Sequence, residues 1–393
     1  ITIPMMKRKG YSPEFAGAVE TVASTGGALM PPVMGALAFI MADYMGVPYW
    51  QIASAAILPA VLYYVAVYLQ VSFYSSRHRL GGLNTEEIPM LKKVLRDGWP
   101  FILPLFIMVY LFARYGWDAM RVGFTVILVV AAIYFCQSLF KRREKIGVPL
   151  KGVYHAFAGS AKSMASIMPA ACLAGIIMAS VNMTAIGLRL SAGILDLANG
   201  QLFILLVLCG LCCILMGMAV DLIVIYIIMA VMITPAMTTL GVTAMAANLF
   251  ILYYTVVGLI TPPVCVATYA AASISESKPF RTGFNAVRLG FVALVIPFVF
   301  CYKPELLFQG DSLWMTVQTA FFTLLAVIAL AAALEKYFFR FELTVPEMIL
   351  LIAVGLLLLL TPLWANLAGT ALFAGYLVFC CLTKRSQRAG KTA

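Results

Sequence analysis

Long apolar segments alternate with short polar stretches along the whole chain. A helix that crosses a membrane needs about 20 mainly apolar residues, and most of these segments reach that length. The pattern predicts an all-α, polytopic membrane protein. The more polar stretch 149–163 is expected to lie along the membrane surface. Uninterrupted spans are expected at 50–74, 98–114, 118–140, 164–187, 284–302, 313–334, 346–362 and 366–382.

Two further apolar segments are interrupted by a pair of prolines, Pro31-Pro32 and Pro262-Pro263. A proline inside a helix removes a backbone donor and clashes with the preceding turn, so two in succession break the helix. In hydrocarbon, the freed carbonyl groups are tolerated only inside protein or beside a wet cavity. The prolines therefore predict two discontinuous helices, at 14–30 with 33–45 and at 245–260 with 263–275.

A third apolar segment, 202–238, is interrupted at mid-length between Gly217 and Asp221. A polar, glycine-containing turn at that depth is typical of a re-entrant hairpin. Asp221 is the one carboxylate in this segment, and an ionisable residue at such depth is a functional candidate. Three roles stay open: it holds a cation, it carries a proton, or it caps the returning helix.

The two proline pairs belong to a longer internal duplication. The separation of Gly27 and Gly258, 231 residues, also aligns other positions without a gap. Four prolines and two glycines in phase are hard to reach by chance, so we interpret the match as a repeat. The aligned pairs include Pro4 with Pro235, Gly10 with Gly241, Pro31 with Pro262, Pro32 with Pro263, and Pro48 with Pro279.

Positive charge gives the orientation of the repeats. The chain is 63% hydrophobic with a net charge of +11, and its basic residues lie between the spans, which indicates membrane topology rather than nucleic-acid binding. With the N-terminal basic loop in the cytoplasm, the predicted spans place the basic residues inside, with four exceptions. The two discontinuous helices then run in opposite directions, as in secondary transporters. The exceptions are Arg114, Arg121, Arg189 and Lys303.

The candidate ion- and substrate-binding site lies at the two breaks and the hairpin tip. Half-helix N-termini favour an anionic group, whereas unwound carbonyls and C-terminal ends favour a small cation. Hydroxyl groups beside the breaks suit sodium, which takes oxygen ligands. The candidate residues are Ser24, Thr25, Gly27, Pro31, Pro32, Gly217, Asp221, Thr255, Gly258, Thr261, Pro262 and Pro263.

Enzymatic function is not expected. The sequence shows no phosphate-binding loop, metal-ligand cluster or nucleophile with a base, and no cofactor is expected beyond a coupling ion, Na⁺ or H⁺. An integral-membrane enzyme and a passive channel are the alternatives to a transporter. The inverted repeat argues against the channel, because a passive pore needs no alternating access.

Four motifs resemble the large membrane subunit of the tripartite ATP-independent periplasmic (TRAP) transporters. The resemblance is strongest to the fused-permease type that works with a TAXI-class binding protein, and it covers about residues 1–310. The final three spans resemble the C-terminal extension of that type. The motifs are Thr2 to Tyr11, Ala23 to Val33, Ile260 to Val264, and Thr282 to Gly290.

The resemblance implies an elevator-type importer in a bacterial inner membrane, with a cytoplasmic C-terminus. Its implied partners are a periplasmic substrate-binding protein, a small four-helix membrane subunit and membrane lipid, with a small organic acid as substrate and sodium as the usual driving ion. Gly217 and Asp221 match the hairpin tip of the family. Leu222 and Ile223 replace the hydroxyl residues that usually follow, which puts a second sodium site in doubt and raises proton coupling through Asp221.

We divide the chain into four parts. The hairpin at 217–221 has no counterpart within the chain, because the 231-residue offset places that counterpart before Ile1. The first repeat is therefore expected to be incomplete at its N-terminal end. The parts are 1–75 (first inverted repeat), 76–163 (connecting spans and surface arm), 164–310 (second inverted repeat) and 311–393 (three-span extension).

Overall fold

The computed structural model is almost wholly helical, as expected for an all-α membrane protein. It describes residues 2–81, 90–141, 148–184, 186–218, 222–310, 312–338 and 341–389. Seven of the described helical segments are long and apolar enough to cross a membrane, and one of them, Pro279–Tyr302, consists of two successive helices. The elements are α1 (Thr2–Arg8), α2 (Pro13–Gly26), α3 (Gly35–Met45), α4 (Tyr49–Arg77), α5 (Leu91–Tyr115), α6 (Ala119–Lys141), α7 (Val148–Thr184), α8 (Ile186–Leu197), α9 (Leu202–Gly217), α10 (Leu222–Thr239), α11 (Ala244–Gly258), α12 (Val266–Ser275), α13 (Pro279–Leu289), α14 (Val292–Tyr302), η2 (Pro304–Leu307), α15 (Leu313–Glu335), β1 (Tyr337–Phe338), β2 (Phe341–Glu342), α16 (Val345–Leu359) and α17 (Leu363–Ala389).

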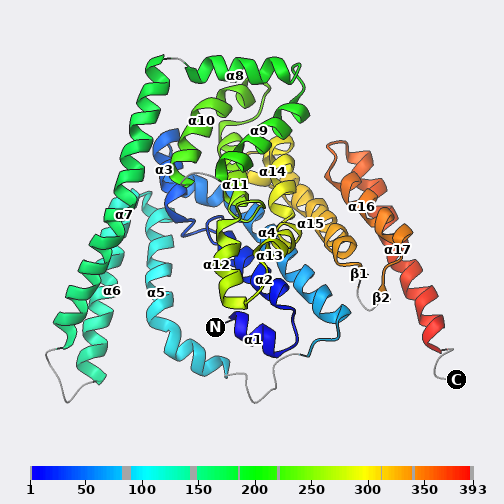
Figure 1. Cartoon of the computed structure of the whole chain (residues 1–393), viewed down its shortest axis with the longest axis horizontal. Helices are drawn as coiled ribbons and strands as arrows, with labels where there is room; N and C mark the ends of the chain where they lie inside the picture. Colours follow the sequence, from blue (N-terminus) through cyan, green and yellow to red (C-terminus); the bar gives the residue numbers. More distant parts are fainter. Residues whose placement is uncertain are drawn as a thin grey trace.

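The two predicted discontinuous helices are confirmed. One consists of α2 and α3, the other of α11 and α12, and both are interrupted at their proline pairs. In Figure 1 the chain rises from α2 to α3 but descends from α11 to α12, so the two broken helices run in opposite directions. The architecture is thus an inverted repeat.

Corresponding residues stand at the starts of both halves of each broken helix. Ser12 caps α2 by accepting from a backbone N–H three residues on, and its counterpart Thr243 caps α11 in the same way. Gly10 and Gly241, two residues earlier, both have positive φ. After the breaks, Met34 and Cys265 adopt left-handed backbone conformations. Each pair is separated by the 231-residue offset, so the duplication extends to local backbone geometry.

The predicted hairpin corresponds to two antiparallel apolar helices, α9 and α10, that pack on α11. The amphipathic helix α8 precedes them at one end of the molecule (Figure 1). The turn that joins the two helices, 219–221, lies outside the described residues, and Asp221 lies within it.

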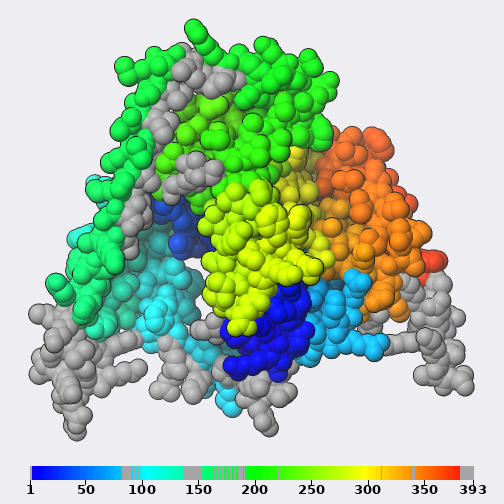
Figure 2. All heavy atoms as spheres, in the orientation of Figure 1, coloured from blue at the N-terminus to red at the C-terminus, as the bar shows by residue number. Residues whose placement is uncertain are grey.

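The stretch 149–163 differs from the expectation. It continues without interruption into the next span as the 37-residue helix α7, although Pro169 lies inside that helix. Helices α5 to α7 flank the central body on one side, and the C-terminal helices α16 and α17 flank it on the other (Figure 2). The expected boundary at residue 163 therefore falls within a continuous helix.

The expected span 284–302 is divided into α13 and α14. The division falls at Gly290 and Phe291, and it leaves the last carbonyl groups of α13 without partners in their own helix. Gln70 of α4, fully buried, donates its side-chain amide to the carbonyl of Leu289 at 2.7 Å. A side chain from a distant helix thus stabilises this end, which sequence periodicity alone does not reveal.

The C-terminal helices α15 to α17 are joined to the body by polar contacts as well as by packing of α15 against α4. Glu335, at the end of α15, lies 3.2 Å from the guanidinium of Arg288, and Arg77 donates to the Glu335 carbonyl. At the other end of this module, Lys303 donates to the carbonyl of Leu360. Partial burial lowers the pKa of the Lys303 ammonium group.

Candidate functional site

The first break covers residues 27–34. The backbone N–H groups that follow α2 form short turns, of which Gly27 N–H to Ser24 carbonyl is the first. Tyr49 of α4 donates to the carbonyl of Pro32 at 2.7 Å, so one carbonyl freed by the proline pair is satisfied from outside the helix. Pro31 and Pro32 are partly exposed. The break is an irregular backbone segment held by neighbouring helices.

The second break covers residues 259–265 and repeats this arrangement. Pro262 lies against α13, where a Cβ atom built on Gly283 would be 3.0 Å from the proline ring. Pro263 is exposed. The N–H of Ala267 reaches back across the break to the Leu259 carbonyl. The second break is thereby anchored on α13, which forms part of the same repeat.

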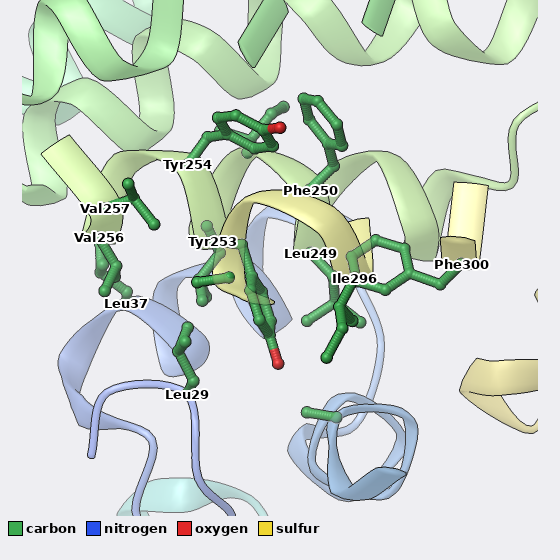
Figure 3. Close-up of a cluster of buried hydrophobic side chains, with 14 of the residues drawn as sticks. Leu29, Leu37, Leu249, Phe250, Tyr253, Tyr254, Val256, Val257, Ile296 and Phe300 are labelled. Atoms are coloured by element: carbon green, nitrogen blue, oxygen red, sulfur yellow. The ribbon is translucent and has the colours of Figure 1, made fainter. Parts of the chain in front are cut away.

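The two breaks meet in the centre of the molecule. Figure 3 shows Leu37 of α3 next to Val256 and Val257 at the end of α11, with Leu29 of the first break in the same buried cluster. All four are buried. The inverted repeat therefore brings both interrupted segments to one region, although they are more than 200 residues apart in sequence.

The hairpin tip touches the second break directly. A Cβ atom built on Gly258 would lie 2.9 Å from the backbone of Gly217, and one built on Gly217 would lie 2.9 Å from the Thr255 carbonyl. Such an approach excludes any side chain at either position. Gly217 and Gly258, both predicted as site residues, are thus in contact. Asp221 lies outside the described residues.

The four predicted hydroxyl groups differ in their partners. Thr25 and Thr261 each donate to the carbonyl one turn earlier in their helices, and Ser24 donates to the carboxylate of Glu20. The hydroxyl of Thr255 is fully buried and has no hydrogen-bond partner. An unsatisfied buried hydroxyl costs about 1–3 kcal/mol, so this group needs a ligand or another explanation.

A second unsatisfied hydroxyl, that of Tyr253, was not predicted. The Tyr253 side chain is fully buried, its hydroxyl has no partner, and in Figure 3 it points from α11 towards the first repeat. A tyrosine within an apolar helix is usually a core residue, so the sequence carries no signal for this position.

The second halves of both broken helices begin without the usual side-chain cap. Met34 and Cys265 stand at the N-cap positions of α3 and α12, and their side chains accept no hydrogen bond from the first turn. Helix N-termini carry a partial positive charge and favour anions. The region therefore combines anion-favouring helix ends with oxygen atoms that suit a cation, and the described residues contain no cluster of three metal-binding side chains.

Discontinuous helices that meet between inverted repeats are typical of secondary membrane transporters. Comparison with known proteins identifies the family. The sequence model for the DctM component of tripartite ATP-independent periplasmic transporters matches residues 1–315, so the chain belongs to this family. Membership makes it the permease of a transporter that works with a periplasmic binding protein and a small membrane subunit.

One curated relative is similar over much of the chain. It is a protein of Salmonella typhimurium, described as the uncharacterized protein YgiK, and it is 22% identical over 311 residues. The aligned region covers 78% of this chain and 68% of the relative.

Proposed function

We propose that this permease imports small carboxylates delivered by a TAXI-class periplasmic binding protein, driven by an inward sodium or proton gradient. The protein would lie in a bacterial inner membrane with its C-terminus in the cytoplasm. The observation that carries the proposal is the meeting of two oppositely directed broken helices. Such an arrangement can expose one site to either side of the membrane in turn.

The elevator mechanism fits this arrangement. The hairpin α9–α10 contacts α11 through backbone atoms at Gly217 and Gly258, so hairpin and broken helix can move as one body. The carboxylate of the substrate would lie near the uncapped starts of α3 and α12, where partial positive charge is available. The coupling ion would lie beside it, where it offsets the substrate's charge.

We further propose that a hairpin tip covers the first break, as α9 covers the second. Ser24 and Gly27 are exposed, whereas their repeat counterparts Thr255 and Gly258 are buried. The covering segment would belong to another part of the assembled transporter. The predicted incompleteness of the first repeat stays a prediction.

Uptake into proteoliposomes tests the function. The full transporter with its binding protein is expected to accumulate radiolabelled four- or five-carbon dicarboxylates when a sodium or pH gradient is imposed, and only with the binding protein present. Substrate flux that equilibrates without following either gradient would favour the passive channel instead. Omission of the binding protein and collapse of each gradient are the controls.

The Thr255 hydroxyl supplies a specific test of the ion site. Because it is buried without a partner, we propose that it is a sodium ligand at the second break. Thr255→Ala is expected to raise the sodium concentration for half-maximal uptake about tenfold, the equivalent of one lost ligand worth about 1.4 kcal/mol. Thr255→Ser should retain near-normal sodium dependence.

The matched control is Thr323→Ala in α15. Thr323 is also a buried threonine, but its hydroxyl donates to the Thr319 carbonyl, away from the breaks. Equal sodium dependence in Thr255→Ala and Thr323→Ala would contradict the assignment of Thr255.

A further inference from the structure

One face of α2 carries an acidic side chain and leads to the first break; we call this face, formed by Glu20, Ser24 and Gly27, the stripe. Glu20, Ser24 and Gly27 follow one another at helical spacing, so they share one face of the helix. Ser24 and Gly27 are exposed and Glu20 is partly exposed. The stripe therefore forms an open surface that leads along α2 to the break.

The Glu20 carboxylate has hydroxyl partners but no cationic one. One oxygen accepts from the hydroxyl of Ser24 at 3.3 Å, and the other accepts from the hydroxyl of Thr2 on α1. No ion pair joins Glu20 to a basic side chain within the part of the chain that the structure describes. Three side chains thus bring carboxylate and hydroxyl oxygens together, the donor type that hard cations prefer.

The residues of the second repeat that correspond to the stripe are covered by a neighbouring helix. The 231-residue offset places Ile251, Thr255 and Gly258 at the positions of Glu20, Ser24 and Gly27. All three counterparts are buried on α11, against which α9 of the hairpin packs. The same face is apolar and covered in one repeat, but acidic and open in the other.

Coverage of the first stripe would bury a carboxylate. Glu20 lies two helical turns, roughly 10 Å, before Gly27, well inside the half-helix. An ionised carboxylate removed from water without a partner is strongly unfavourable, so it must take up a cation or a proton when the face closes. Ile251 imposes no such requirement on the second repeat.

We propose that Glu20 is the carboxylate through which the first repeat takes up the coupling ion, with Ser24 and Thr2 as its oxygen partners. The inference rests on the proposed ion-driven transport and adds a residue to it. Ion uptake permits the stripe to be covered, and this links ion occupancy to the movement of the first broken helix. While Glu20 is ionised and has no ion bound, its charge would keep the stripe exposed to water.

The basic side chains near Glu20 that form ion pairs are paired with other carboxylates. Helix α2 packs against α1, α4, α12 and α13. Among their basic groups, Lys7 pairs with Glu276 and Arg288 pairs with Glu335. The remaining charged or titratable groups of these elements and of α2 are Arg8, Glu14, Tyr49, Tyr63, Tyr64, Tyr68, Tyr74, Arg77, Tyr269 and Arg281.

Ion-dependent thermal stability tests the site without a substrate. An ion that binds only the folded protein raises the melting temperature of that protein. The wild-type protein is expected to melt higher in sodium than in potassium, or higher at acidic than at neutral pH if the ion is a proton. Glu20→Gln should lose this shift. Glu14→Gln, a carboxylate change on the first turn of the same helix, should retain it.

Transport assays of the full transporter with its binding protein test the coupling. With radiolabelled four- and five-carbon dicarboxylates, Glu20→Gln is expected to lose gradient-driven accumulation by at least about tenfold, within the usual range of coupling between two ligands. It should still exchange internal for external substrate, because glutamine mimics a neutralised carboxylate. Glu20→Asp should restore part of the accumulation.

Three outcomes would overturn the proposal. The first is a wild-type protein whose melting temperature responds to neither sodium nor pH. The second is Glu20→Gln with wild-type accumulation, and the third is Glu20→Gln that loses exchange together with accumulation, since the residue would then serve binding or folding. If the wild-type protein shows the ion-dependent shift but transports no dicarboxylate, the substrate proposal fails while the ion site stands.

Discussion

The Gly258→Val variant is expected to lose transport and to melt at a lower temperature than the wild type. A Cβ atom at position 258 would lie 2.9 Å from the Cα and carbonyl carbon of Gly217 and 3.1 Å from the Ile214 carbonyl oxygen. These are backbone atoms, which cannot rotate away as a side chain can. Overpacking of this kind typically costs about 1–3 kcal/mol, and here it must also separate the hairpin from the break.

The measurement pairs a melting curve in detergent with dicarboxylate uptake in proteoliposomes. Gly123→Val in α6 is the control, because a Cβ atom at Gly123 meets nothing within 4 Å. This control should show near-normal stability and uptake. A Gly258→Val protein that melts and transports like Gly123→Val would show that the hairpin and the second break do not rely on this contact.

The parts of the fold that the sequence predicted have local causes. The proline pairs interrupt their helices wherever the rest of the chain lies, and Ser12 and Thr243 cap theirs by contact with the next turn. Because the repeats are separated by a constant offset, each local feature predicted in one repeat is also predicted at the corresponding position of the other. The inverted arrangement followed from charge, which depends on position along the chain rather than on packing.

The parts that were missed depend on distant contacts. The division of α13 from α14 is accompanied by an amide donor from Gln70, more than 200 residues away. In contrast, Pro169 lies inside α7 without ending it. A single proline or glycine in an apolar segment is compatible with a kink, a break or a continuous helix, and neighbouring helices decide among them.

The candidate site shows the same limit. Sequence reasoning grouped Thr25, Thr255 and Thr261 because each hydroxyl lies near a break. Thr25 and Thr261 donate to their own helices, and Thr255 does not. Since the choice depends on side-chain rotamers and on surrounding packing, spacing alone cannot separate them. Glu20 is absent from the candidate residues that the sequence predicts, and its hydrogen bond with Ser24 is visible only in the structure.

The contact between Glu335 and Arg288 predicts an unequal response to two substitutions. Only 1% of the Glu335 side chain is exposed, whereas 36% of the Arg288 side chain is exposed. Removal of Arg288 leaves a buried carboxylate, which water cannot reach. Removal of the Glu335 charge leaves a guanidinium that remains partly hydrated. Arg288→Leu should therefore destabilise the protein more than Glu335→Gln does.

The expected cost of Arg288→Leu is on the order of 2 kcal/mol, below the usual cost of breaking a fully buried pair because Arg288 is partly hydrated. Glu335→Gln should cost less, since glutamine keeps the shape of the side chain and Arg77 still donates to the unchanged Glu335 carbonyl. The double variant Arg288→Leu with Glu335→Gln should recover part of the loss, because no buried charge then remains without a partner.

Melting temperatures of the four proteins in this double-mutant cycle give the coupling between the two residues. Arg121→Leu is the matched control, since Arg121 and Asp118 form an ion pair whose side chains are both mostly exposed. Such surface pairs contribute about 0–1 kcal/mol, so the control should melt close to the wild type. If Arg288→Leu and Arg121→Leu behave alike, the C-terminal helices are held to the body by the packing of α15 on α4 rather than by this buried charge.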